Sequence, residues 1–406
     1  MFDAVIVGAG ASGLVSAIVA ARRGKKILIV EKNSKVGKKL LATGNGKCNI
    51  TNQRPTLEHF YSQNQKFIAS VFEDYSYQSV KQFFKSIGLE LIEAKEGKVF
   101  PMSLQASSVV ELLECECEQL AVKIVCDALV ENISFRSGHF VIKYNNQQVE
   151  SRKVVLATGH CSAPQLGGVL DGIGFARAFN HKIIKDFPTL VQLTSAHKES
   201  YLKRMAGVKV ESRVTVEVGE RTVHKQGDVL FTNYGISGLA ILDISRFVMV
   251  ELLKKKSVML TIDLMPKMSD EQLFALMKKS LVKKSSKPLA IWMQGFMNKK
   301  LILPILESLQ LEKETVGSIL LNLKNLETIV KKIKQFTFEI NGSKGYKGAE
   351  VATGGVDTKE VNAKSLESKK QEGLYVTGEL LDVDGDRGGF NLYFAWISGF
   401  RVGKSI

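Results

Sequence analysis

Cysteines are few in this sequence, and their spacing does not suggest disulfide or metal chemistry. The five are odd in number and form no Cys-x-x-Cys pair: Cys48, Cys115, Cys117, Cys126 and Cys161. Cys115 and Cys117 lie in a Glu-rich helical stretch without metal-ligand spacing or histidine partners, which argues against zinc. With no recognisable secretion signal, this usage predicts reduced thiols in a cytoplasmic protein, without disulfides and without a metal.

Long charge-free runs are also scarce, although Ala4 to Ala21 spans 18 residues without a charge. That length suits a membrane span or a signal peptide. However, Asp3 replaces a basic leader, glycines interrupt the run, and Arg22 and Arg23 end a helix that is too short to cross a bilayer. We therefore predict a soluble protein without a membrane span.

Composition is that of a globular protein: 406 residues, 45% hydrophobic and 24% charged, enough for two or three domains. Lysine and arginine exceed aspartate and glutamate by 56 to 41, a net charge of +15. This excess favours anionic partners such as a dinucleotide, acidic metabolites, nucleic acid or a membrane surface. Charge alone does not choose among them.

The strongest motif lies at the start of the chain. A buried strand over Phe2–Val7 runs into Gly8, Gly10 and Gly13 and then into a helix over Ser12–Arg23. In such a G-x-G-x-x-G turn the backbone N–H groups and the helix dipole favour a pyrophosphate. The first glycine makes the turn, the second lets the ligand approach, and the third lets helix and strand pack closely.

A second strand over Ile27–Val30 ends at Glu31, which is placed to accept hydrogen bonds from a ribose diol. The alternative is an ordinary βαβ unit with a tight turn. The following segment, Lys32 to Asn52, combines glycines, lysines and amides, and we interpret it as a second ligand contact rather than a solvated surface loop.

The middle of the chain changes character twice. After Pro188, alternating Val- and Thr-rich segments predict a small antiparallel sheet or barrel. From Ser269 the pattern is helical and rich in lysine, as in Lys283 and Lys284. We interpret these lysines as a solvated face; the alternative is a nucleic-acid or membrane patch, although no aromatic residues alternate with them.

The C-terminal part carries the second strong motif. A buried strand over Gly373–Glu379 is followed by Gly388 and Gly389 and by a helix N-terminus, another combination that favours an anion. Two such sites at opposite ends of the chain predict one long ligand that contacts both. FAD fits this better than NAD, whose fold usually keeps its contacts within one contiguous half.

Several segments together resemble the BaiN/aminoacetone-oxidase-type family of FAD-binding oxidoreductases, also called YhiN-like flavoproteins. They are GAGASGL, GKKLLATGNGKCNITN, GISGLAILDIS, TGGV with SLESK, and GLYVTGELLDVDGDRGGFNLYFAW. The resemblance implies an α/β fold with a two-dinucleotide-binding (Rossmann-like) FAD domain over residues 1–190 and 341–406. It also implies a β-barrel-like insert over residues 191–267 and 335–340, and a helical insert over residues 268–334.

By the same resemblance, the FAD contacts are spread over both ends of the chain and the returning strands between them. They would be Gly8, Gly10, Ala11, Ser12, Gly13, Glu31, Lys32, Lys39, Leu40, Thr43, Gly44, Asn49, Ala128, Leu129, Thr158, Gly159, Gly378, Glu379, Asp386, Gly389, Phe390 and Asn391.

The chain departs from the family pattern near the expected flavin. Asn233 stands where a histidine is common, Leu239 where proline is usual, and Phe390 and Tyr393 where tyrosine and glutamine are usual. We therefore name no catalytic residue. Four histidines are candidates for proton transfer by residue type alone, with a structural role as the alternative: His160, His181, His197 and His224.

The resemblance implies flavin-mediated hydride or two-electron transfer to or from a small organic molecule, with transiently bound NAD(P)H or oxygen as co-substrate. A permanent NAD(P)H domain is not expected, because the sequence has no second G-x-G-x-x-G unit. Two alternatives remain: a flavin-containing nucleic-acid-associated protein and a non-catalytic FAD-binding sensor. We favour the enzyme with a small-molecule substrate over both.

Overall fold

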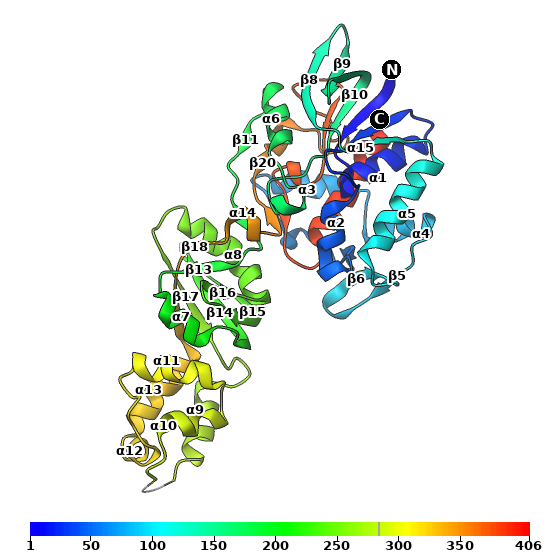
Figure 1. The fold of residues 1–406 in the computed structure, drawn as a ribbon. Coiled ribbons are helices and arrows are strands. Elements are labelled where there is room, and N and C mark those ends of the chain that lie inside the picture. The colour runs from blue at the N-terminus through cyan, green and yellow to red at the C-terminus, as the bar shows by residue number, and fades with distance from the viewer. Residues whose placement is uncertain (283–284) are drawn as a thin grey trace. The chain divides into compact units, whose positions relative to one another are not determined.

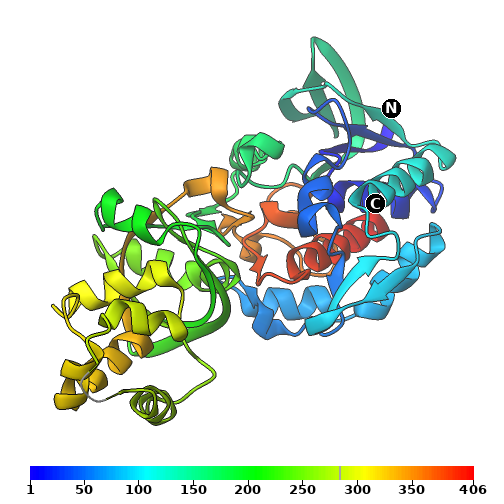
Figure 2. The ribbon, with the colours of Figure 1, turned by 60° about the horizontal axis from the view of Figure 1, so that its bottom comes forward.

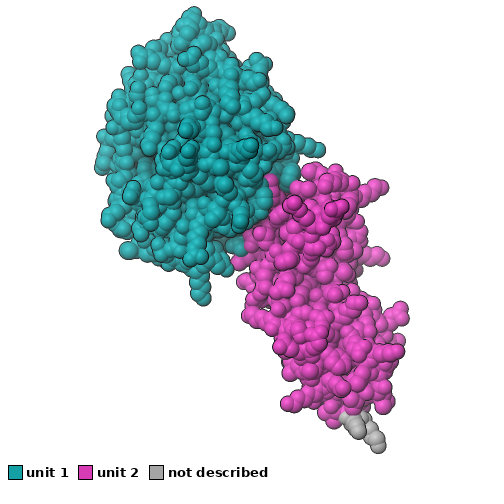
Figure 3. Space-filling view, turned by 180° about the vertical axis from the view of Figure 1, so that it is seen from behind, with its two compact units in different colours: residues 1–187, 350–406 teal, residues 188–349 magenta. Residues whose placement is uncertain are grey.

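The computed structural model describes residues 1–282 and 285–406, so Lys283 and Lys284 lie outside the described part. The chain forms two compact units, coloured separately in Figure 3. Unit 1 comprises residues 1–187 and 350–406, and unit 2 comprises residues 188–349. Both ends of the sequence therefore belong to unit 1, and unit 2 is inserted between them.

Unit 1 is built on a seven-stranded sheet with the order β7-β2-β1-β10-β9-β8, in which β21 also pairs with β10. Parallel pairing joins β1 to both β2 and β10. Residues 4–7 of β1, all of β2 and the last three residues of β10 are apolar and buried, as expected for parallel strands covered on both faces. The strands are β1 (Phe2–Val7), β2 (Ile27–Val30), β7 (Lys123–Val125), β8 (Val130–Arg136), β9 (His139–Tyr144), β10 (Gln147–Leu156) and β21 (Leu374–Val376).

Helices α1 (Ala11–Ala21) and α15 (Phe390–Ser405) pack against each other, and α5 (Ala106–Gln119) also packs against α1. The blue α1 and the red α15 lie side by side in Figures 1 and 2. Their close approach depends on Gly399, where an added Cβ would lie 2.8 Å from the Ser12 carbonyl oxygen. The first and last helices of the chain thus form one layer beside the glycine turn.

Short elements complete unit 1. A three-stranded sheet has the order β3-β6-β5, and β4 pairs with β22. These strands and the helices around them are α2 (Lys38–Ala42), β3 (Thr51–Asn52), β4 (Phe60–Tyr61), α3 (Gln65–Phe72), α4 (Tyr77–Ser86), β5 (Leu91–Glu93), β6 (Lys98–Pro101), α6 (Asp171–Ala178), β11 (Ile183–Ile184), β20 (Gly355–Val356) and β22 (Asp384–Gly385).

Unit 2 contains the predicted barrel, which is closed and has the order β13-β16-β15-β14-β17-β18. Alternate residues of its strands are buried, as in β14, where Val214 and Val216 face the core. Its elements are β13 (Leu193–Ser195), α7 (Glu199–Met205), β14 (Lys209–Val218), β15 (Arg221–Phe231), β16 (Gly235–Ser237), α8 (Leu239–Leu252), β17 (Val258–Asp263) and β18 (Phe336–Ser343).

Between β17 and β18 the chain forms a group of helices whose apolar faces share the core of the barrel. The first begins at Ser269, whose side chain and that of Gln272 form a reciprocal capping box. The helices are α9 (Asp270–Lys279), α10 (Leu289–Trp292), α11 (Lys299–Ser308), α12 (Val316–Leu321) and α13 (Leu323–Lys334). Across the described residues, we find no helix with both the length and the apolar character needed to cross a bilayer.

Candidate cofactor site

The glycine turn joins β1 to α1, and its three glycines meet different surroundings. Gly8 has φ +108°, and an added Cβ would lie 2.5 Å from the Ala157 carbonyl oxygen of the neighbouring strand end. A Cβ at Gly13 would collide with the Gly8 carbonyl oxygen. At Gly10, however, no described atom lies within 4 Å of the added Cβ. Space at the N-terminus of α1 is therefore open where the pyrophosphate was predicted.

Glu31 lies directly after β2, and its buried carboxylate faces the turn. Oε2 accepts a hydrogen bond from the Ala9 N–H at 2.7 Å, and Oε1 accepts one from the Asn33 N–H at 2.7 Å. The Glu31 carbonyl accepts the Ala128 N–H at 2.9 Å. Oε1 also accepts from Asn33 Nδ2 at 2.6 Å, whereas Oε2 has one described partner and a further lone pair. These bonds hold Glu31 beside the turn and leave Oε2 able to accept from a ribose.

Lys39 connects the second predicted segment to the C-terminal one. It lies on α2, and its Nζ donates to Glu379 Oε2 at 2.7 Å and to Ser162 Oγ at 2.6 Å. Ser162 Oγ donates to Glu379 Oε1 at 2.7 Å, and the Ala352 N–H donates to the same oxygen at 3.0 Å. Four chain segments therefore meet at one carboxylate.

The charge state of this cluster follows from burial and from the neighbouring cation. Burial raises the pKa of Glu379, but the charge and hydrogen bond of Lys39, with the hydrogen bond from Ser162, outweigh it and hold the pKa below its ordinary value. Glu379 is thus ionised at neutral pH. The Lys39–Glu379 pair fixes the second glycine segment to the end of β21 with a charge-assisted bond.

His160, Cys161 and Asp186 form a second polar group beside this cluster, with potential ligand atoms within 4.8 Å of one another. His160 Nδ1 already accepts the Cys161 N–H at 2.8 Å, so its lone pair is used within the chain. Burial lowers the pKa of His160 and raises the pKa of Cys161 to about 12, so both are neutral at pH 7. We assign no metal to this group.

A buried hydrogen-bond donor without a described partner, in this same polar group, supports the binding of a cofactor here. Because Nδ1 of the neutral His160 accepts, Nε2 carries the proton. His160 is 2% exposed, and Nε2 finds no hydrogen-bond partner among the described residues. A buried donor without an acceptor is costly, and a cofactor oxygen or ring nitrogen would supply one. With the open space at Gly10, this residue set fits a long polar ligand such as FAD.

The C-terminal motif is held in a fixed shape by its own side chains. Gly389, with φ +100°, caps α15, and an added Cβ would collide with the Thr51 carbonyl oxygen. Asn391 binds back to the loop before the helix: its Oδ1 accepts from the Gly385 N–H, and its Nδ2 donates to the Gly385 carbonyl, both at 2.8 Å. The N-terminus of α15 is thereby held in place.

The predicted contact residues fall in unit 1, and contacts between the described residues connect most of their segments. Gly378 lies against Ser12, Gly159 lies against Glu379, and Ala128 binds Glu31. Leu129 is 47% exposed, and no described contact ties its side chain to the group. Contact of each residue with FAD stays a prediction.

Sequence reasoning missed His59, which pairs with Asp386. Its four candidate histidines have other surroundings: His160 and His181 are buried, His197 stacks on Tyr201, and His224 is exposed on β15. His59 ends a short 3-10 helix directly before β4, so no local pattern in the sequence signalled its pairing with a residue 327 positions later.

A Rossmann-type sheet, a glycine turn open at Gly10 and a second motif from the far end of the chain define a flavoprotein of the FAD-binding class. The chain belongs to the HI0933-like family, because the model of the HI0933-like protein Rossmann domain matches residues 2–405. Its cofactor is FAD, and it is an oxidoreductase.

Curated relatives match over the full length. The 3-dehydro-bile acid delta(4,6)-reductase of Clostridium scindens is 34% identical over 98% of this chain and 98% of its own. The ribosomal RNA dihydrouridine synthase of Haemophilus influenzae is 32% identical over 99% of this chain and 98% of that protein. The Escherichia coli protein of the same name is 30% identical over 100% of this chain and 98% of that protein.

Among solved structures, the chain is similar in fold to 3-ketosteroid delta1-dehydrogenase from Sterolibacterium denitrificans. The TM-score is 0.54 with 12% sequence identity, covering 99% of this chain and 98% of that one. Together with the family match and the closed barrel of unit 2, this similarity confirms the predicted α/β architecture with a Rossmann-like FAD domain and a barrel. At this level of sequence identity the similarity supports a shared fold but gives no information about the substrate.

Proposed function

We propose that this flavoprotein reduces a carbon–carbon double bond that is conjugated to a carbonyl group. The supporting observation is shared chemistry among its full-length relatives. One is named as a reductase of delta(4,6) double bonds in a 3-oxo steroid acid, and the others as synthases of dihydrouridine. Uridine and a 4,6-dien-3-one both carry a double bond conjugated to a carbonyl, and both names describe its saturation.

The residues of unit 1 suit this reaction. Conjugation lets a hydride add to the β carbon while negative charge develops on the carbonyl oxygen, so a reductase needs a hydride donor, an acid and groups that stabilise the anion. FAD supplies the two-electron chemistry when it is bound. The N-terminus of α15 at Gly389 presents backbone N–H groups whose dipole favours negative charge.

Reoxidation of the reduced flavin tests the proposal. The purified protein is reduced with dithionite under argon and then mixed with a 4,6-dien-3-one steroid, a 4-en-3-one steroid, or the saturated 3-ketone. We expect the oxidised flavin absorbance to return with the conjugated ketones only, because the saturated ketone has no β carbon that accepts hydride. The proposal is wrong if neither conjugated steroid nor a uridine-containing RNA reoxidises the flavin.

A second candidate substrate is uridine within RNA, and the charge distribution supports it. Unit 2 has 26 Lys and Arg against 15 Asp and Glu, a net charge of +11, whereas unit 1 has 30 against 26, a net charge of +4. Most of the excess therefore lies in the inserted unit. Polyanions are attracted to such surfaces over long range.

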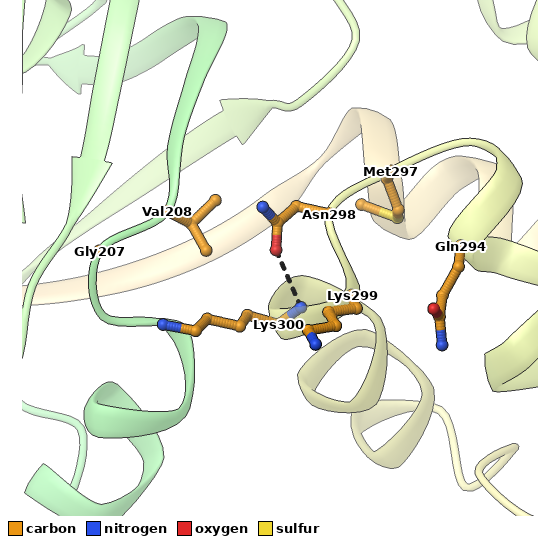
Figure 4. Close-up of a pocket in the computed structure, with 7 residues that line it drawn as sticks. All are labelled: Gly207, Val208, Gln294, Met297, Asn298, Lys299 and Lys300. Atoms are coloured by element: carbon orange, nitrogen blue, oxygen red, sulfur yellow. Dashed lines mark hydrogen bonds between the residues drawn. The ribbon is translucent and has the colours of Figure 1, made fainter.

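One cavity of about 470 Å³ lies within this basic unit (Figure 4). Lys299 and Lys300, at the N-terminus of α11, line it together with Gln294 and Asn298. Lys300 Nζ donates to the Ala206 carbonyl oxygen at 2.7 Å, which holds the side chain along the cavity. Asn298 caps the helix by accepting the Lys300 N–H at 3.0 Å.

Filter binding of a ribosomal RNA transcript separates the two substrates. If RNA is the substrate, affinity should fall steeply between 50 and 200 mM salt, and Lys299→Gln with Lys300→Gln should reduce the salt slope by about 2. The matched control replaces two exposed lysines of unit 1, Lys85 and Lys143. A protein that retains no RNA even at the lower salt concentration has a small-molecule substrate.

A further inference from the structure

His59, Tyr61 and Asp386 form a polar cluster that the cofactor site does not explain. Strand β4 pairs antiparallel with β22, with Gly385 opposite Phe60 and Asp384 opposite Tyr61. The ladder continues outside the strands, because the Asp386 N–H donates to the His59 carbonyl oxygen at 2.8 Å. His59 and Asp386 are therefore cross-strand neighbours, a position that brings side chains together.

Both oxygens of the Asp386 carboxylate are engaged by the facing strand. Tyr61 Oη donates to Oδ1 at 3.0 Å, and His59 Nδ1 lies 3.4 Å from Oδ2. The imidazole also stacks on the Phe390 ring, with centroids 4.0 Å apart and an angle of 15° between the rings. The ring of His59 is thus oriented from two sides, by a carboxylate and by the first residue of α15.

One edge of this oriented imidazole remains accessible. The His59 side chain is 36% exposed, whereas that of Asp386 is 19% exposed. Since Nδ1 faces Asp386, Nε2 lies on the opposite side of the ring. A partly exposed histidine whose Nδ1 is held by a carboxylate, with Nε2 directed away from it, has the arrangement of a general acid–base group.

We propose that His59 is the proton donor of the double-bond reduction and that Asp386 is its positioning residue. This inference rests on the proposed function. It also rests on the segment from Asp386 to Asn391 as part of the flavin site, because that segment supplies both the carboxylate and the stacked Phe390 ring. The sequence prediction places the flavin against the same residues.

When bound and reduced by two electrons, FAD would supply the hydride that forms a C–H bond at the β carbon, and the π electrons of the double bond would move toward the carbonyl to give an enolate. The imidazolium of His59 gives its Nε2 proton to the α carbon, and the C=O bond re-forms. In total the substrate gains two electrons and two protons, one proton within the hydride and one from His59. The bound cofactor would be the two-electron donor, and solvent returns a proton to the partly exposed imidazole.

Asp386 contributes through its hydrogen bond to His59. The carboxylate keeps the Nδ1 proton in place and orients the ring so that Nε2 points away from Asp386. Tyr61 holds the second carboxylate oxygen. Asp386→Asn keeps the size but removes the charge, so it should slow proton transfer, whereas Tyr61→Phe should have a smaller effect on the same step.

Two half-reactions separate this role from a structural one. We expect His59→Gln to bind FAD within about twofold of wild type and to be reduced by dithionite as wild type is. Reoxidation by a 4-en-3-one steroid or, where that is the substrate, by uridine RNA should slow by about 100-fold or more, the usual contribution of a general acid. The solvent deuterium isotope effect on reoxidation should also change.

The matched control is His139→Gln, since His139 also faces a carboxylate, Glu150 at 3.5 Å, but on β9. It should leave both half-reactions unchanged. Reoxidation of His59→Gln within threefold of wild type overturns the assignment to His59 while the proposed function stands. If wild-type flavin is reoxidised by no conjugated acceptor, the proposed function fails and this inference fails with it.

Discussion

Gly10→Val is expected to give a folded protein that no longer binds FAD. The backbone at Gly10 has φ −81° and ψ −170°, an extended conformation that valine adopts readily. No described atom lies within 4 Å of the added Cβ, so the apoprotein accommodates it. The same space is where the pyrophosphate approaches the turn, so we expect FAD affinity to fall by about 100-fold or more, equivalent to at least ~2.7 kcal/mol.

The comparison with Gly13→Val sharpens this test. There the added Cβ meets the Gly8 carbonyl oxygen and lies 3.3 Å from Ala157 Cβ, so the substitution should disrupt the packing of α1 on the sheet. The two variants are compared by flavin absorbance after dialysis against FAD and by thermal unfolding of the apoprotein. Gly295→Val, at another open glycine in unit 2, is the control. Retention of FAD by Gly10→Val at wild-type affinity would contradict the assignment of the turn.

Arg401→Met should destabilise unit 1 by about 3 to 5 kcal/mol, because it leaves buried carbonyl groups without donors. The Arg401 side chain is 5% exposed, and its Nε and Nη2 donate to the Val71 and Ser70 carbonyl oxygens, both at 2.8 Å. These carbonyls belong to the last turn of α3, where intrahelical donors run out. A residue near the C-terminus thus caps a helix that lies more than three hundred positions earlier.

Chemical denaturation monitored by circular dichroism measures this effect, and Arg22→Met is the matched control. Arg401 Nη2 lies 3.0 Å from the Asp74 carboxylate, and Arg22 likewise binds a carboxylate, Glu116 at 2.8 Å, but the Arg22 side chain is 32% exposed. A pair at the surface contributes at most about 1 kcal/mol, so the control should change the free energy of unfolding little. Equal losses in the two variants would show that the buried carbonyls of α3 do not need Arg401.

The fold was predictable in outline because its signals are local. The apolar strand Phe2–Val7, the glycine spacing after it and the strand Ile27–Val30 lie within three dozen residues, and β1 and β2 have these bounds in the structure. The helix between them ends at Ala21, two residues before the predicted Arg23, because Arg22 and Arg23 leave the buried face to reach carboxylate and carbonyl partners. Boundaries depend on such tertiary partners more than on periodicity.

The alternating segments after Pro188 predicted a small antiparallel sheet or barrel, but the order of its strands could not be predicted from the sequence. Strand β13 pairs with both β16 and β18, which lie about 40 and 140 residues later in the chain. Pairing over such separations depends on which apolar faces pack together, and many strand orders satisfy the same alternation. The closed order therefore came only from the structure.

What the sequence by itself determined is the cofactor class. The glycine turn and the motif ending at Gly389 have fixed spacing because backbone N–H groups must converge on an anion within a few residues. Only the tertiary structure decided which side chains meet: Lys39 with Glu379, and His59 with Asp386, are pairs separated by 340 and 327 positions. A hydrogen bond between side chains needs a few ångströms of proximity and leaves no local pattern. The glycine turn therefore identifies the class of ligand, whereas the tertiary fold decides which reactive side chains are brought together around it.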